Sequence, residues 1–269
     1  MKTLKDILRI FIHVHWIKTL ILNFRLLSIR NAIKFPFVVT GKLRLGPLTG
    51  KVEFKCPLRF GLVNIGKDMD NMPIAFAPAR FQIQGKIIIQ GPLVINQSAA
   101  VIVWPNGTLD IAEGVRICSG VLLKSTNYIK IGKFTTFTSG CFVMDTNVHA
   151  IKFVETGRIG RTSSPIIIGD YCWITMNSSI MPGAKIPDFS IATRYALMNK
   201  DYTLDNKIGA LIGGMPAKVI KYGCQRIFDP DKERKINRYF ALNPSEQEYY
   251  DQIGFDEVNL SDTEEFFRI

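Results

Sequence analysis

Residues 168–198 read IGDYCWITMNSSIMPGAKIPDFSIATRYALM, and this stretch has an aliphatic residue at every sixth position. These residues are Ile168, Ile174, Ile180, Ile186, Ala192 and Met198, and a small residue follows each of the first five after four places: Cys172, Ser178, Ala184, Ser190 and Ala196. An α-helix turns about 100° per residue, so six-residue steps would scatter these side chains around it. One unbroken strand would far exceed the usual length of about 3 to 10 residues. The chain must therefore bend once per hexad, which predicts a parallel β-helix with the aliphatic residues inside and the small residues at tight corners.

The six-residue spacing also runs through the preceding part of the chain, in shifted phases. The positions are Ile83, Ile89, Ile95 and Val101, then Ile111, Ile117, Leu123 and Ile129, then Ile131, Phe137 and Val143. Each shift of phase predicts a loop or a corner with an extra pair of residues.

The period disappears for about twenty residues between Val143 and Ile166. A long irregular loop inside a tight repeat is usually functional or disordered. This loop begins with Asp145 and His149, and Arg158 and Arg161 lie in its middle.

Four short motifs in and after the repeat are similar to those of a known family: Ile168-Gly169, Trp173-Ile174, Pro182-Gly183 and Gly214-Met215-Pro216-Ala217-Lys218. They resemble the C-terminal half of the hexapeptide-repeat acyltransferases, a family of left-handed parallel β-helix O-acetyltransferases acting on sugars. The resemblance is close from Ile129 to Tyr222 and looser in the earlier repeats. It implies acetyl-CoA as the acyl donor and a homotrimer whose active site lies between neighbouring subunits.

Three parts of the chain are expected. Residues 1–34 form an amphipathic helical segment, residues 35–223 form the β-helix with the loop 145–165, and residues 224–269 form an acidic tail with a helix around Asp231 to Leu242. Charged residues and histidines interrupt the apolar N-terminal segment, which does not fit a membrane-spanning helix. No small-residue cleavage site follows the segment, so a signal peptide is not expected. Two alternatives stay open for it: a helix packed over the open end of the coil, or a basic helix lying on anionic lipid. For the tail, the alternatives are a cap on the other end of the coil and an arm for self-association.

The charge and the cysteines narrow the classes of function. The formal net charge is +11, but residues 229–269 carry a net −6, which leaves +17 on residues 1–228. A basic body suits a ligand with several phosphates, such as a coenzyme, or anionic lipid. No Arg-rich stripe with interleaved aromatic residues is present, so nucleic acid is not expected as a partner. The five cysteines, Cys56, Cys118, Cys141, Cys172 and Cys224, show no paired spacing, which favours reduced thiols in the cytoplasm and a filling role at corners.

One histidine is the candidate catalytic base. Acyl transfer to a hydroxyl needs a group that takes the hydroxyl proton, and imidazole suits this task near neutral pH. His13 and His15 have apolar neighbours and are interpreted as structural or interfacial. His149 stands where the loop leaves the coil, and the resemblance implies that it is the general base. Asp145 is expected to orient the ring or the acceptor, with capping of a turn as the alternative.

The resemblance also implies where coenzyme A lies. Its groove is formed largely by backbone amides of stacked turns and a basic residue near the C-terminal end of the coil. The corresponding positions are Met176, Arg194, Asn199, Lys200 and Lys218, with Lys221 close by. The three lysines can pair with phosphates, and Trp173 is expected to pack at a corner beside the groove. Thr193-Arg194-Tyr195 departs from the small residues of the family, which leaves open an altered donor, a shifted pantetheine arm or a coil that no longer catalyses.

Three hypotheses about function follow. The first is an O-acetyltransferase that moves an acetyl group from acetyl-CoA to a sugar hydroxyl in surface-polysaccharide or glycolipid synthesis, in the cytoplasm or at the inner face of the membrane. The second is an N-acyltransferase acting on a nucleotide-linked amino sugar, and the third is a non-catalytic β-helix scaffold. No metal is expected, because one histidine outside the N-terminal segment is too few for a three-histidine zinc site.

Overall fold

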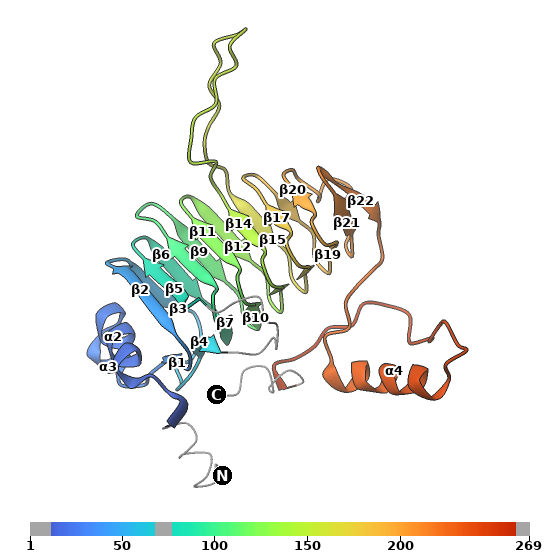
Figure 1. The fold of residues 1–269 in the computed structure, drawn as a ribbon, viewed down its shortest axis with the longest axis horizontal. Coiled ribbons are helices and arrows are strands. Elements are labelled where there is room, and N and C mark those ends of the chain that lie inside the picture. Colours follow the sequence, from blue (N-terminus) through green and yellow to red (C-terminus); the bar gives the residue numbers. More distant parts are fainter. Residues whose placement is uncertain (1–11, 68–76, 262–269) are drawn as a thin grey trace.

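The structure of the protein, a computed structural model, describes residues 12–67 and 77–261. In this part of the chain, three sheets wrap around one core, and successive turns of the chain add a strand to each sheet in order (Figure 1). All strand pairs in these sheets are parallel except the last pair of sheet A. The prediction of a parallel β-helix is confirmed.

We name the sheets A, B and C. Sheet A contains β1 (Phe37–Val39), β4 (Val63–Lys67), β7 (Leu93–Asn96), β10 (Val115–Ile117), β13 (Thr136–Phe137), β16 (Trp173–Ile174), β19 (Ile191–Ala192), β21 (Leu211–Gly214) and β22 (Ala217–Lys221). Sheet B contains β2 (Leu43–Leu48), β5 (Ala79–Ile83), β8 (Ala100–Val103), β11 (Leu122–Ser125), β14 (Phe142–Met144), β17 (Ser179–Ile180) and β20 (Leu197–Met198). Sheet C contains β3 (Lys51–Phe54), β6 (Lys86–Ile89), β9 (Thr108–Ile111), β12 (Tyr128–Ile131), β15 (Ile166–Ile168) and β18 (Lys185–Ile186).

The core of the coil is made of the aliphatic residues that recur every six positions. All six aliphatic positions of the stretch 168–198 are at most 2% exposed, and the five small residues between them are fully buried. Each burial of a large aliphatic side chain contributes about 1.5–3 kcal/mol, so each added coil stabilises the stack.

The shifts of phase have a different origin from the one expected. They do not come from longer corners, because the extra residue pairs lie inside four-residue strands. β8 buries both Val101 and Val103, and β12 buries both Ile129 and Ile131. The earlier coils therefore have longer sides than the C-terminal coils, whose strands β16 to β20 contain two residues each.

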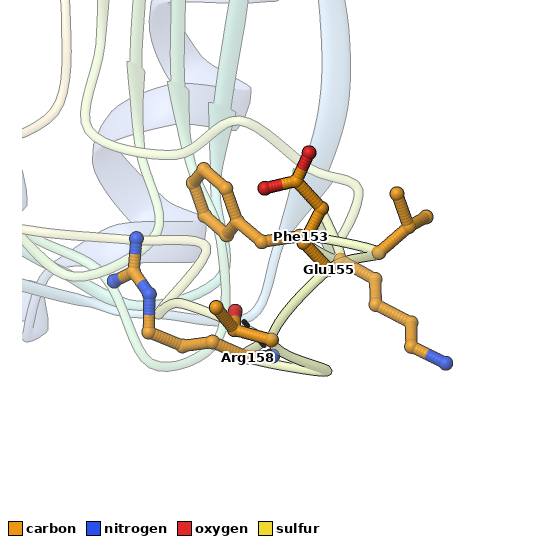
Figure 2. Close-up of a pocket in the computed structure, with 6 residues that line it drawn as sticks. Phe153, Glu155 and Arg158 are labelled. Carbon is orange, nitrogen blue, oxygen red and sulfur yellow. Dashed lines mark hydrogen bonds between the residues drawn. The ribbon is translucent and has the colours of Figure 1, made fainter.

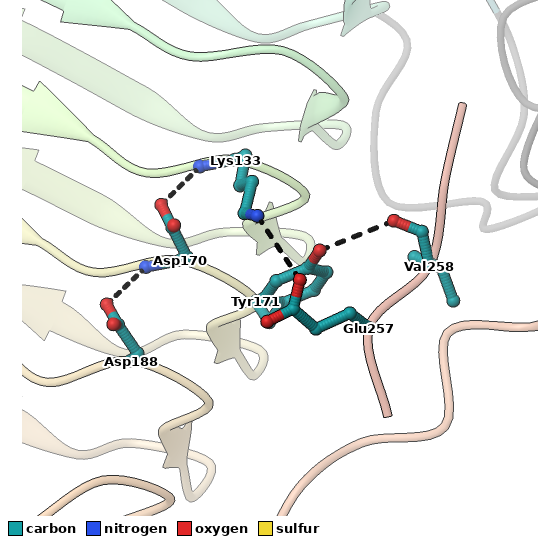
Figure 3. A network of polar contacts seen from close by, with 6 residues as sticks. All are labelled: Lys133, Asp170, Tyr171, Asp188, Glu257 and Val258. Atoms are coloured by element: carbon teal, nitrogen blue, oxygen red, sulfur yellow. Dashed lines mark hydrogen bonds and ion pairs between the residues drawn. The ribbon is translucent and has the colours of Figure 1, made fainter. Parts of the chain in front are cut away.

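The corner between sheets C and A explains the Gly-Asp pair of the repeat. Asp170 Oδ1 accepts a hydrogen bond from Lys133 N, and Asp188 Oδ1 accepts one from Asp170 N, both at 2.8 Å (Figure 3). A Cβ atom on Gly169 would lie 2.3 Å from Asp188 Oδ1, and one on Gly132 would lie 2.4 Å from Asp170 Oδ1. Only glycine leaves room at these positions for the carboxylate of the following coil.

The N-terminal end of the coil is covered by α2 (Trp16–Leu26), which is followed by the short α3 (Ile29–Ala32) (Figure 1). Leu22 is fully buried in the core. Asn23 Nδ2 donates to the carbonyl oxygen of Phe37, and Asn23 Oδ1 accepts from the N–H of Phe37. Thr19 Oγ1 accepts from Val39 N at 3.1 Å. These side chains satisfy the edge of β1, which would otherwise be open to pairing with another chain. Of the two alternatives for this segment, the structure confirms the cap.

The C-terminal end of the coil is closed by the hairpin of β21 and β22 and by Tyr202, whose hydroxyl donates to the carbonyl of Ala217 at 3.2 Å. The expectation that the tail caps this end is wrong. The tail runs back along the corner between sheets C and A, where Phe134, Tyr171 and Phe189 form a stack with ring centroids 5.4 and 4.8 Å apart.

Two contacts of the tail with this corner appear in Figure 3: Tyr171 OH donates to the carbonyl of Val258 at 3.3 Å, and Lys133 Nζ lies 3.5 Å from Glu257. The stacked rings offer a continuous apolar surface along the corner. The tail therefore covers apolar rings that would otherwise face water.

The helix expected in the tail is α4 (Pro230–Leu242). Its N-terminus follows a capping pattern, because the side chain of Asp229 accepts from the backbone of Asp231 and Lys232 and a proline occupies the first turn. Lys232 ties the helix to the returning tail through Asp256 at 2.6 Å.

No helix in the described part is long and apolar enough to cross a bilayer. Residues 1–11 of the expected N-terminal segment and residues 262–269 of the expected tail lie outside the described residues.

Candidate active site

The loop between β14 and β15 is a long hairpin arm that projects from the corner between sheets B and C (Figure 1). Its two sides are joined by antiparallel bridges between Thr146 and Ser163 and between Lys152 and Ile159. Residues 147–161 are exposed to solvent. The loss of the six-residue period thus marks an ordered arm that leaves the coil and returns to it.

His149 lies near the base of this arm with its side chain exposed. Its backbone N–H donates to the carbonyl of Asn147 at 2.7 Å. The residue before it, Val148, has a φ of 64° and is held there by a hydrogen bond from its N–H to Thr146 Oγ1 at 3.0 Å. A positive φ is costly for a β-branched residue, and such strain clusters at functional sites. The local backbone therefore fixes the direction in which the imidazole leaves the arm.

Asp145 is fully buried and does not face His149. Its carboxylate accepts from Thr126 N and Thr126 Oγ1, both at 2.8 Å, from Asn127 N at 2.9 Å and from Ser125 Oγ at 3.1 Å. Four donors satisfy most of the lone pairs of a carboxylate. This geometry favours the capping alternative for Asp145, which anchors the base of the arm to the preceding coil.

The sequence interpretation did not identify the partners of Asp145. Ser125, Thr126 and Asn127 lie 18 to 20 positions before it, which is the length of one coil. Polar residues at this separation face each other at the same corner of neighbouring coils. A search for such pairs at the coil repeat would have found the turn from the sequence.

Two of the residues proposed for coenzyme binding lie at the corner between sheets A and B. Met176 and Arg194 occupy equivalent positions in successive coils, and Tyr195 N donates to the carbonyl of Met176 at 3.3 Å. The guanidinium of Arg194 lies 5.0 Å from the ring centre of Tyr195, and both side chains are exposed. The bulk noted in the sequence therefore stands on the outside of the corner and does not fill the core.

The other four residues lie elsewhere. Asn199 and Lys200 are exposed at the corner between sheets B and C, two coils beyond the arm, where Lys185 N donates to the carbonyl of Lys200 at 3.1 Å. Lys218 and Lys221 are exposed on β22, and neither forms an ion pair within the described residues. Two coils correspond to about 10 Å along the axis. One chain thus places His149 and Lys200 on one edge of sheet B, and Met176 and Arg194 on the other edge.

A shallow hollow of about 480 Å³ lies at the tip of the arm, and Figure 2 shows its lining residues. It is formed by the arm alone: Lys152, Phe153, Val154, Glu155, Thr156 and Arg158. The guanidinium of Arg158 stacks 4.2 Å from the ring centre of Phe153. None of the proposed site residues lines this hollow, so it is not the proposed reaction site.

Trp173 lies on sheet A, where Arg226 of the tail stacks over its ring at 5.2 Å. Burial lowers the pKa of Arg226 from its ordinary value. The expected role of Trp173 in packing fits this contact, and the tail covers the ring from outside.

Burial raises the pKa of Cys141 and of Cys172 to about 12. The thiol of Cys141 donates to the carbonyl of Thr175 at 3.1 Å, and that of Cys172 to the carbonyl of Pro187 at 3.3 Å. A neutral buried thiol is a poor nucleophile. Both cysteines fill tight corners, as their positions in the hexads indicated.

Comparisons with known proteins give one sequence match and several structural matches. No family model matches the chain. Over 89 residues the chain is 30% identical to YvoF of Bacillus subtilis (strain 168), whose name provisionally assigns it as an acetyltransferase. The match covers 33% of this chain and 47% of that protein, so the chain aligns with about half of its relative. The name of this relative gives the same class of reaction that the resemblance in the sequence motifs implies.

The solved structures are similar at low sequence identity. The acetyltransferase NeuO, specific for polysialic acid, matches with a TM-score of 0.48 and 17% identity over 80% of this chain and 91% of that chain. The polysialic acid O-acetyltransferase OatWY matches with a TM-score of 0.42 and 15% identity, over 74% of this chain and 95% of that chain. The N-acyltransferase AntD of Bacillus cereus was solved with dTDP-4-amino-4,6-dideoxyglucose and coenzyme A. It matches with a TM-score of 0.41 and 12% identity, over 77% of this chain and 88% of that chain.

Proposed function

We propose that the chain is an O-acetyltransferase that moves an acetyl group from acetyl-CoA to the hydroxyl of a sugar, with His149 as the general base. The observation that carries the proposal is the exposed imidazole at the base of the arm, on the same edge of sheet B as Lys200. The sequence match to a protein named as an acetyltransferase supports the same class of reaction.

The proposed reaction uses one proton-transfer group. The unprotonated ring nitrogen of His149 takes the proton of the acceptor hydroxyl, and the oxygen attacks the carbonyl carbon of the thioester. The tetrahedral intermediate collapses as the carbon–sulfur bond breaks, and the leaving thiolate receives the proton from the imidazolium. The products are an acetyl ester and free coenzyme A, and the histidine returns to its starting state.

Asp145 has a positioning role in this proposal. Its carboxylate is occupied by the turn at Ser125, Thr126 and Asn127, so it holds the base of the arm and does not contact the imidazole. The strained Val148 then sets the direction of the next residue. His149 is therefore placed by the backbone of the arm.

The coenzyme is proposed to lie along the C-terminal coils. Lys218 and Lys221 present exposed ammonium groups that can pair with phosphates, and Lys200 lies 5.5 Å from the ring centre of Tyr202. The parts of the coenzyme beyond its phosphates would contact Met176, Arg194 and Asn199. Because His149, Asn199 and Lys200 lie on one edge of sheet B and Met176 and Arg194 on the other, we propose that one chain supplies His149 and a neighbouring chain supplies the other edge, in a homotrimer.

The acceptor is proposed to be a sugar of a surface polysaccharide or glycolipid, and the place of action is the cytoplasm or the inner face of the membrane. This assignment follows the family resemblance and the basic charge of residues 1–228.

Three measurements test the proposal. Isothermal titration with acetyl-CoA should show binding, and a screen of sugar acceptors should release free thiol only with a competent hydroxyl. Mild alkali should then remove the acetyl group from the product, because esters hydrolyse where amides do not. An alkali-stable product would favour the N-acyltransferase, and no binding of acetyl-CoA would favour the scaffold.

A further inference from the structure

The helix α2 has a buried face and, opposite to it, an exposed apolar face. One face carries Thr19, Leu22 and Asn23 and covers the end of the coil, as described above. The other face carries Ile17, Leu20, Ile21 and Phe24, which follow the helical spacing i, i+3, i+4 and i+7. The contact with the coil therefore leaves the apolar outer face of the helix uncovered.

The outer face is exposed to solvent. Ile17 is 77% exposed, and Leu20, Ile21 and Phe24 are each exposed by more than two fifths. The following α3 adds Ile29, which is 75% exposed, and Ile33 follows it one helical turn later at 60%. Large apolar side chains gathered on one exposed helix face mark a site of interaction.

The edges of this outer face carry an aromatic residue and cations. Trp16 and Phe24 both contact Phe35 edge-on, with ring centroids 6.1 and 6.3 Å apart. Arg25 lies at the opposite edge of the stripe and is exposed. An apolar stripe bordered by an amphipathic ring and by cations is the arrangement of helices that lie in a membrane interface.

The charge around the outer face has one sign. Arg30 and Lys34 of the α3 region are also exposed, and residues 12–52 contain seven Lys/Arg and no Asp/Glu. The acidic residues of the chain are concentrated in the tail after residue 228. A protein partner with a neutral apolar surface would not require this bias, whereas an anionic lipid surface attracts each nearby cation.

We propose that the outer face of α2, together with Ile29 and Ile33, docks the protein on the surface of a bilayer that contains anionic phospholipid. Ile17, Leu20, Ile21 and Phe24 enter the boundary between headgroups and acyl chains, and Arg25, Arg30 and Lys34 pair with the lipid phosphates. The two alternatives for the N-terminal segment are then compatible, because the helix caps the coil with one face and binds lipid with the other. This inference does not depend on the proposed enzymatic activity.

The test is flotation of the full chain with vesicles of phosphatidylcholine alone, or with about 30% phosphatidylglycerol to supply the anionic charge. We expect binding to the anionic vesicles that weakens as salt rises from about 0.1 to 0.5 M. The triple variant Ile17→Ser/Ile21→Ser/Phe24→Ser should lower the partition coefficient at least about 10-fold. The double variant Arg25→Gln/Arg30→Gln should lower it about 30-fold.

Matched controls lie on α4. Leu242 is 71% exposed, and Lys235 and Arg238 are exposed, so Leu242→Ser and Lys235→Gln/Arg238→Gln should leave binding unchanged. Circular dichroism of each variant checks that the coil is intact.

Absence of binding to anionic vesicles by the native chain would overturn the proposal. Equal binding by the triple variant would also overturn it. If light scattering shows that the triple variant loses a subunit contact while its lipid binding stays unchanged, the face binds a second copy of the chain and the proposal is wrong.

Discussion

At the scale of single residues, Asp145 and His149 stand four positions apart in very different surroundings. The carboxylate is fully buried and accepts four hydrogen bonds, whereas the imidazole is exposed. An orienting role for Asp145 in the manner of a catalytic dyad would need a direct contact between the two side chains, and the turn of the preceding coil occupies the carboxylate. In the proposed reaction, Asp145 would therefore act through the backbone of the arm.

Asp145→Asn should lower the stability of the protein. The amide has the same size, but its NH2 group would face donors that now meet a carboxylate oxygen. We expect a loss of about 2 kcal/mol in the free energy of unfolding, measured by urea denaturation. Glu155→Gln, which removes one exposed carboxylate of the arm, is the matched control and should have no effect. Equal stability of the Asp145 and Glu155 variants would contradict the anchoring role.

Cys141 and Cys172 should resist alkylation in the folded protein. At pH 8 a thiol with a pKa of about 12 is ionised about a thousandfold less than one with the ordinary value of about 9. Mass spectrometry after treatment with iodoacetamide should find modification at Cys56 and Cys224, which are partly exposed, before either of the buried pair. Modification of Cys141 or Cys172 at the rate of Cys224 would show that the corners open.

At the scale of elements, α2 stabilises the coil because it satisfies an edge strand. Asn23 makes three hydrogen bonds, of 2.7, 2.7 and 3.1 Å, with Thr19 and with both backbone groups of Phe37. Without these partners the edge of β1 would carry buried unpaired groups, which are costly.

Asn23→Ala should therefore reduce the free energy of unfolding by about 2–3 kcal/mol, because it leaves the N–H and C=O of Phe37 without partners. Thermal and urea denaturation measure the change. Asn237→Ala on the exposed face of α4 is the control and should change stability little. A negligible effect of Asn23→Ala would mean that water satisfies the edge of β1.

The elements differ in how well the sequence predicts them. The strands of the central coils follow from the hexads, because only a β-helix points an aliphatic residue at every sixth position into one core. Ile174 and Ile180 are fully buried in that core, as the repeat predicts. The longer sides of the early coils were assigned wrongly to corners, since a two-residue shift of phase looks the same whether it occurs in a strand or at a corner.

The site was harder to predict than the coil. The position of His149 on an arm followed from the loss of the repeat, but the direction of the arm has no periodic signal. The path of the tail depends on contacts such as Phe255 on Phe189, whose rings lie 4.7 Å apart and whose positions are far apart in sequence. Local patterns carry no information about such contacts.

At the scale of the whole molecule, the exposed arm supports our proposal that the site is shared between chains. The arm exposes Ile151, Phe153, Val154 and Ile159, and no element among residues 12–67 and 77–261 covers them. Exposed apolar residues on a projecting hairpin suit contact with a neighbouring subunit.

Replacement of residues 150–161 by Gly-Gly, with His149 retained, should convert the assembly from trimer to monomer. Light scattering coupled to size-exclusion chromatography should give three times the mass of one chain for the native protein and one chain for the variant. Far-UV circular dichroism should be unchanged, because the arm makes few contacts with the coil. A native protein that is monomeric would contradict the shared site.

The most direct test of the account is the rate of thiol release from acetyl-CoA by His149→Ala, measured with an acceptor that the native protein uses. We expect the rate to fall about 10²–10⁴-fold, because the general base is lost. The affinity for acetyl-CoA should stay the same, and His13→Ala, which removes an exposed histidine outside the arm, should leave both unchanged. A rate for His149→Ala equal to that of the native protein would contradict the assignment of the base.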